Sequence, residues 1–115
     1  MTRYRSTQQR VLRVDLTHGS IDWQEVPSQD ERNYLGGRGI AAALLARTLP
    51  ADVDPLAPDA PLIFSMGTLT GTTAPMSGRS NITFVSPATG LYCKTNVGGH
   101  FGLYCKLSGV DYILI

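Results

Sequence analysis

Glycine interrupts the sequence so often that the elements of its second half must be short. Eight of the twelve glycines fall between residues 67 and 109, and three of the seven prolines lie in the segment ADVDPLAPDAP. Both residue types mark turns and loops rather than the interiors of helices and strands. The segments between them are short, and strand-like segments outnumber helical ones. We therefore expect an α+β fold, a β-rich domain of short, mostly antiparallel strands with two short helices.

Local patterns place these elements along the chain. Residues 11–26 predict a hairpin, because VLRVDL and IDWQEV alternate apolar and polar side chains around the turn THGS. Ser28 or Asp30 is a suitable cap for a short helical turn, and IAAALLARTL predicts a helix over 39–49. The other expected elements are strands in PLIFSMG, NITFVS and LYCKTNV, a short helix in HFGLYCKLSG, and a last strand in VDYILI.

The last strand, VDYILI, is strongly apolar and reaches Ile115 without a turn or a polar tail. A β-rich apolar segment left bare is an aggregation hazard. We therefore expect this strand to continue into more protein or to pair with another chain.

Length and composition limit the class of protein. With 115 residues, 17% charged residues and a net charge of +1, the chain predicts one domain over 1–115 with one modest core. This charge balance does not indicate a nucleic-acid partner.

The longest apolar run, residues 40–46, is far shorter than the ~20 residues of a membrane span. The start of the chain also lacks the apolar stretch of a signal peptide, so we expect a cytoplasmic protein without a membrane partner.

Two sequence features that often carry chemistry do not do so here. Cys93 and Cys105 are separated by eleven residues and have no companion Cys or His at metal-site spacing, so we expect buried thiols. The segment GRGIAA matches G-x-G-x-x-A, but it follows the polar run SQDERNYL instead of a buried strand. A dinucleotide-binding site is therefore not expected.

Basic side chains and glycine dominate the second half of the chain. From Ala60 onward, Arg79, Lys94 and Lys106 face a single acid, Asp111. Glycines let backbone N–H groups approach a ligand, and the arginine fork suits a phosphate or another oxyanion. The loop TAPMSGRSNITF, residues 73–84, is therefore a candidate anion site. The same glycines are equally compatible with plain turns between short strands.

The stretch NVGGHFG, residues 96–102, is a second candidate. Paired glycines before an expected helix leave N–H groups free for an anion, and a carbonyl of Asn96 could ligate a hard cation such as Mg²⁺. His100 is either an acid/base group or a structural hydrogen bonder. No Ser/His/Asp set and no carboxylate pair accompanies either loop, so no complete active site is expected.

Three collinear segments resemble one family. YLGGRGIAAALL, GTLTGTTAPMSGRSNITFVSPATG and NVGGHFGLYCKLSGVDYILI look like the N-terminal domain of the tungsten-containing aldehyde ferredoxin oxidoreductases. The resemblance implies a tungsten or molybdenum atom held by two pterin dithiolenes whose phosphates meet around a magnesium ion. It also implies that Arg79, Asn96 and Gly98 bind the pterin cofactor, with the Asn96 carbonyl reaching the magnesium.

The resemblance further implies that much of the enzyme lies outside this sequence. In the family, the cysteines that ligate a [4Fe–4S] cluster, the catalytic groups and the second set of pterin contacts lie in parts without a counterpart here. We therefore expect the isolated chain to be inactive in aldehyde oxidation. It would be completed by the remainder of the enzyme or a separately encoded subunit, with ferredoxin as the electron acceptor. The alternative is a noncatalytic binding or assembly module that retains an anion pocket.

Overall fold

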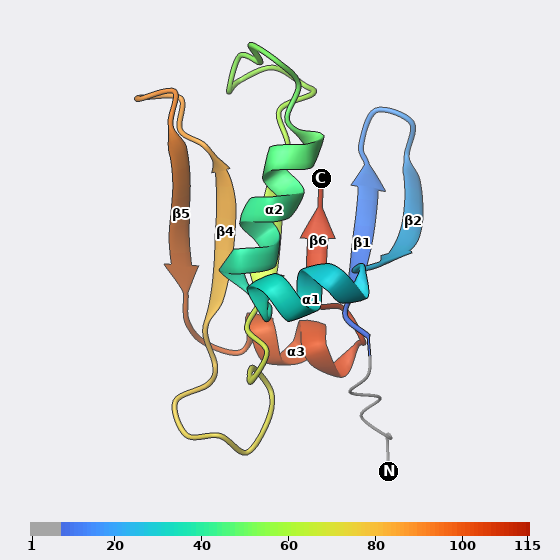
Figure 1. Cartoon of the computed structure of the whole chain (residues 1–115), viewed down its shortest axis with the longest axis vertical. Coiled ribbons are helices and arrows are strands. Elements are labelled where there is room, and N and C mark those ends of the chain that lie inside the picture. Colours follow the sequence, from blue (N-terminus) through green and yellow to red (C-terminus); the bar gives the residue numbers. More distant parts are fainter. Residues whose placement is uncertain (1–7) are drawn as a thin grey trace.

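Six strands and three helices make up residues 8–115, the part of the chain that the computed structural model describes (Figure 1). The start of the chain, from which the absence of a signal peptide was argued, falls largely on residues 1–7 and lies outside the described residues. In chain order the elements are β1 (Arg10–Asp15), β2 (Ser20–Glu25), α1 (Ser28–Tyr34), α2 (Arg38–Thr48), β3 (Ile63–Met66), β4 (Ser80–Val85), β5 (Tyr92–Val97), α3 (Phe101–Leu107) and β6 (Tyr112–Leu114).

The strands form one mixed sheet with the order β2-β1-β6-β3-β4-β5. Every neighbouring pair is antiparallel except β1 and β6, which are parallel. The expectation of a β-rich α+β domain is confirmed. The structure has three helices instead of two, because residues 28–34 form the seven-residue helix α1 and not a single turn.

β6 lies in the middle of the sheet. It pairs with β1 on one side and with β3 on the other, and Ile115 and Leu62 exchange backbone hydrogen bonds of 3.0 Å just beyond it. The prediction that this strand pairs with another chain is therefore wrong, because both of its partners lie within residues 8–115. Its continuation into more protein stays a prediction. Tyr112 and Leu114 are buried on one face of the sheet. A strand with apolar residues on both faces is typical of a central position, and local sequence does not reveal the partners.

One face of the sheet is covered by helices. α2 packs against β3 and β4, and α1 packs against α2 (Figure 1). The predicted helix over 39–49 is thus confirmed to within one residue at each end. The buried core between helices and sheet consists of Val11, Val26, Ile40, Ala41, Leu45, Ile63, Tyr112 and Leu114. None of the helices in residues 8–115 has the length and apolar character that crossing a membrane requires.

An ion pair joins the two covering helices. Asp30 of α1 is 5% exposed, and its carboxylate accepts two hydrogen bonds from the Arg47 guanidinium of α2, with Nη2–Oδ1 at 2.7 Å. The expected capping role of Ser28 or Asp30 is wrong. Pro27 occupies the N-cap position and no side chain caps the helix, because Asp30 faces the other helix instead. Hydrogen bonding to Arg47 lowers the pKa of Asp30 below its ordinary value.

The ion pair between Asp30 and Arg47 should make the thermal stability of the chain depend on pH in the acidic range. A carboxyl group whose folded-state pKa is lowered stabilises the fold above its ordinary pKa of 3.8 and loses that contribution as the pH falls through the lower value. We expect the Tm of the chain to fall more steeply than that of Asp30→Asn between about pH 5 and pH 2. Thermal unfolding followed by circular dichroism at each pH measures this, and parallel Tm curves would contradict it.

The other face of the sheet is apolar as well, and we call it the outer sheet face. A row of directly opposed residues crosses five strands: Trp23, Leu12, Ile113, Phe64 and Ile82. They alternate with the buried core residues, so they lie on the side away from α2. Among the described helices, α3 reaches this face through Phe101, whose ring centroid lies 5.9 Å from that of Phe64. Trp23 remains 52% exposed, with the Arg10 guanidinium 4.7 Å from its ring centroid.

Candidate functional site

The three residues that the sequence indicated lie together at one end of β4 and β5. Arg79 precedes β4, Asn96 lies near the end of β5, and Gly98 follows it. The register of this antiparallel pair, continued by one residue, sets Arg79 opposite Gly98. A Cβ atom on Gly78 would lie 3.6 Å from the Gly99 carbonyl oxygen, so the two segments stay side by side beyond the strands. Arg79, Asn96 and Gly98 are all exposed.

The backbone beside these side chains is free to bind a ligand. Opposed residues of an antiparallel pair alternate between hydrogen-bonded and non-bonded positions. The Ser86 N–H donates to the Leu91 carbonyl at 2.8 Å, and this fixes the phase of the alternation, so Asn96 and Gly98 fall in non-bonded positions. Because β5 is an edge strand, their N–H and C=O groups point to the open edge of the sheet.

A buried threonine holds the Arg79 segment in place. Thr70 is 2% exposed, and its hydroxyl donates to the Arg79 carbonyl at 2.9 Å, while its own N–H donates to the Gly67 carbonyl at 3.0 Å. α3 begins directly against this contact. A Cβ on Gly102 would lie 3.1 Å from Thr70 Cγ2 and 3.4 Å from Ser80 Cβ, so glycine permits the close packing of helix and loop.

The site carries positive charge without a carboxylate. The ion pairs formed within residues 8–115 involve other side chains than Arg79 and Lys94. Lys106 and Asp111, counted above with the basic half of the chain, neutralise each other with Nζ–Oδ1 at 2.5 Å. The Lys94 ammonium instead donates to Asn96 Oδ1 at 3.2 Å. This end of the sheet therefore favours an anion.

The described residues offer little for a metal ion by themselves. In residues 8–115 no group of three or more His, Cys, Asp or Glu side chains is placed to hold one. The outward carbonyl of Asn96 is a hard oxygen ligand of the kind that Mg²⁺ accepts, usually together with waters and phosphates of a ligand. The donors present thus fit a phosphate-bearing group with its magnesium ion, and they do not form a metal site of their own.

Three other candidate residues do not join this site chemically. His100 is exposed, caps α3 without a side-chain hydrogen bond and lies beside Tyr104, with ring centroids 6.1 Å apart. Cys93 and Cys105 are free thiols that are half-buried instead of buried as expected. Burial raises the pKa of the Cys105 thiol, which makes it less reactive.

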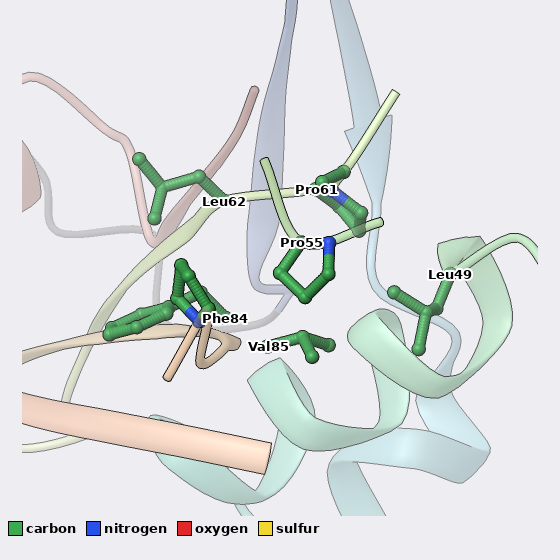
Figure 2. Close-up of a pocket in the computed structure, with 8 residues that line it drawn as sticks. Leu49, Pro55, Pro61, Leu62, Phe84 and Val85 are labelled. Carbon is green, nitrogen blue, oxygen red and sulfur yellow. The ribbon is translucent and has the colours of Figure 1, made fainter. Parts of the chain in front are cut away.

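A cavity of about 250 Å³ lies elsewhere, where β4 ends and the loop after α2 passes over the sheet (Figure 2). It is at the Val85 end of β4, opposite to the Arg79 end. Its lining contains no charged side chain and consists of Leu49, Pro55, Ala60, Pro61, Leu62, Phe84, Val85 and Pro87. Such a lining suits an apolar group and cannot hold a phosphate.

Comparison with known proteins decides the family. The family model described as "Aldehyde ferredoxin oxidoreductase, N-terminal domain" matches residues 11–115. The chain belongs to this family. The tungsten-containing aldehyde ferredoxin oxidoreductases of Pyrococcus furiosus and Thermococcus kodakarensis are 42% and 41% identical to it over 106 residues. These matches cover 92% of the chain and 18% of each relative.

A solved structure gives the same result for this aldehyde ferredoxin oxidoreductase domain. A chain of the active-site complex BamBC of benzoyl coenzyme A reductase, in complex with 1,5-dienoyl-CoA, superimposes with a TM-score of 0.89 at 37% identity. The superposition covers 96% of the domain and 17% of that chain. The resemblance inferred from the three sequence segments is confirmed at the level of family and fold.

Sequence reasoning did not place two residues beside the site in this aldehyde ferredoxin oxidoreductase domain, although it counted Lys94 among the basic residues. Lys94 lies two positions before Asn96 in an expected strand, and the alternation of strands would have placed both on one face. Thr70 gave no such signal, because its partner, the Arg79 carbonyl, is nine residues away in a loop.

Proposed function

We propose that this chain is the cofactor-binding N-terminal portion of a tungsten or molybdenum bis-pterin oxidoreductase. The full enzyme would oxidise aldehydes to carboxylic acids and pass electrons through a [4Fe–4S] cluster to ferredoxin in the cytoplasm. When bound, the metal–pterin cofactor supplies the redox chemistry, and the protein supplies positioning and electrostatics. The tungsten-containing relatives support this choice of cofactor.

One observation carries the proposal: Arg79, Asn96 and Gly98 lie together at one end of β4 and the edge strand β5, and none of the ion pairs formed within residues 8–115 involves Arg79. The Arg79 guanidinium would bind a pterin phosphate through its fork. The Gly98 N–H would donate to the same group, and the Asn96 backbone carbonyl would ligate the magnesium ion that neutralises the phosphates. The site is exposed and forms only part of the surface that would enclose the cofactor, so water competes with the cofactor for each contact.

The outer sheet face supports a role within a larger enzyme. A row of apolar side chains across five strands is unusual for a face in contact with water, since exposed apolar patches commonly mark interaction surfaces. The chain spans about a fifth of the length of its curated relatives. We propose that the remaining polypeptide, joined to this chain or encoded separately, completes the cofactor site. That polypeptide would also contain the [4Fe–4S] cluster, the surface that contacts ferredoxin and the pocket that binds the aldehyde.

Metal and pterin analysis tests the proposal. The chain is purified alone and after co-expression with the polypeptide encoded next to it, and both preparations are assayed for tungsten, molybdenum and pterin fluorescence. We expect metal and pterin in the second preparation alone, together with aldehyde-dependent dye reduction. Robust dye reduction by the isolated chain would contradict the proposal that a second polypeptide completes the cofactor site. The absence of metal and pterin from both preparations would favour the noncatalytic binding module.

A further inference from the structure

We propose that Lys94 is a further anion-binding and positioning residue of this site. Its ammonium lies 3.2 Å from Asn96 Oδ1, where it orients the amide and adds a second positive charge for a phosphate or pyrophosphate group. This inference rests on the proposed function, since it concerns the same site. Neither the two cysteines nor the apolar cavity offers a comparable set of donors.

The sheet geometry places Lys94 on the correct face. Lys94 and Asn96 are two residues apart on β5, so their side chains project to the same side. In the register they lie opposite Thr83 and Asn81 of β4. Arg79 follows the same alternation two residues before Asn81. The face that α2 covers over β4 thus continues onto β5 as a polar strip with an arginine at its end.

The contact with Lys94 decides which atoms Asn96 offers to a ligand. A side-chain amide has one carbonyl oxygen and one NH₂ group. Because the ammonium of Lys94 takes the oxygen, the NH₂ group is directed away from it and can donate to an anion. Without Lys94, the amide could turn its oxygen toward the phosphate, which would repel it.

The charge of Lys94 is available to a ligand. Its side chain is half-buried and forms none of the ion pairs found in residues 8–115. Lys106 differs, because Asp111 neutralises it. Two unneutralised cations at one site favour a ligand with two or more negative charges, and the attraction weakens as salt is added.

Titration with inorganic pyrophosphate in the presence of Mg²⁺ tests the inference on the full chain, with backbone and Asn96 NH₂ resonances followed by NMR. We expect Lys94→Gln to bind roughly threefold to tenfold more weakly than the unchanged chain, with a smaller salt dependence. Lys94→Arg should restore most of the affinity. Arg32→Gln is the matched control, because it removes one exposed charge from α1, and it should bind like the unchanged chain.

The outcomes separate this inference from the proposed function. If Arg79→Gln loses binding while Lys94→Gln keeps full affinity, the role of Lys94 is refuted and the anion site stands. If Lys94→Gln and Arg32→Gln weaken binding equally, the effect comes from the net charge of the chain, and the specific role of Lys94 is refuted. If the unchanged chain does not bind pyrophosphate at all, the anion site and the inference fall together. An Asn96 NH₂ resonance that shifts with pyrophosphate, and does so less in Lys94→Gln, supports the positioning role.

Discussion

Replacement of Arg79 by glutamine is expected to remove most of the affinity of the site for pyrophosphate and, in the assembled enzyme, for the pterin cofactor. Arg79 is exposed, and the Thr70 hydroxyl holds its backbone carbonyl, so the backbone is anchored while the guanidinium stays available to a ligand. A hydrogen bond to a charged group contributes roughly 1.5–3 kcal/mol. The loss should therefore be about tenfold to a hundredfold.

Three variants make the Arg79 experiment specific. Arg79→Lys keeps the charge but loses the planar fork, so we expect an intermediate affinity. Arg32→Gln serves again as the control of equal charge. Thr70→Val removes the hydroxyl that holds the Arg79 carbonyl at similar side-chain volume, and it should weaken binding while Arg79 itself is unchanged. Pyrophosphate binding that survives Arg79→Gln would place the anion elsewhere on the domain.

Replacement of Lys106 by methionine should cause the largest loss of stability among the charged residues. The side chains of Lys106 and Asp111 are 5% and 16% exposed, and the Asp111 carboxylate also accepts a hydrogen bond from the Arg10 N–H at 2.9 Å. Removing the ammonium leaves a largely buried carboxylate without its counter-charge, which typically costs roughly 3–5 kcal/mol. Total stabilities of domains are only about 5–15 kcal/mol, so the variant should lose a large share of its free energy of unfolding.

A double-mutant cycle distinguishes this ion pair from ordinary packing. Asp111→Asn alone removes the buried charge but leaves Lys106 unpaired, and the double variant Lys106→Met/Asp111→Asn removes both charges. We expect the double variant to be clearly more stable in urea unfolding than the sum of the two single losses predicts. Strict additivity would show that the two side chains contribute independently, and the ion pair would then be incidental.

Short-range patterns predicted most of the elements, and long-range contacts account for the rest. Alternation and turn residues placed the hairpin, α2 and β3 to β5 correctly, because these depend on neighbours within a few residues. The position of β6 could not be predicted, since it depends on partners such as Arg10, 101 residues before Asp111. The cap assigned to Asp30 failed for the same reason, because Arg47 lies 17 residues away.

The candidate site was predictable in part. The resemblance gave Arg79, Asn96 and Gly98, and the register of β4 and β5 explains why residues 17 and 19 positions apart meet. The free backbone groups of Asn96 and Gly98 could not be predicted from the sequence. They depend on which residue pairs of β4 and β5 are hydrogen-bonded, and no sequence pattern shows this. Only the structure shows that Lys106 does not contribute charge to the anion site. The sequence suggested three available cations, but Asp111 neutralises Lys106.

The central place of β6 has a consequence for how the chain acquires its structure. Among the six described strands, β6 comes last in chain order, yet it separates the β2–β1 hairpin from the β3–β4–β5 meander. Until it has left the ribosome, the two halves have no strand between them and can form only local hairpins. Contacts of such high sequence separation slow folding, and unpaired edges are exposed in the meantime. Deletion of residues 110–115 should therefore prevent the sheet from closing, although every residue of the anion site would still be present.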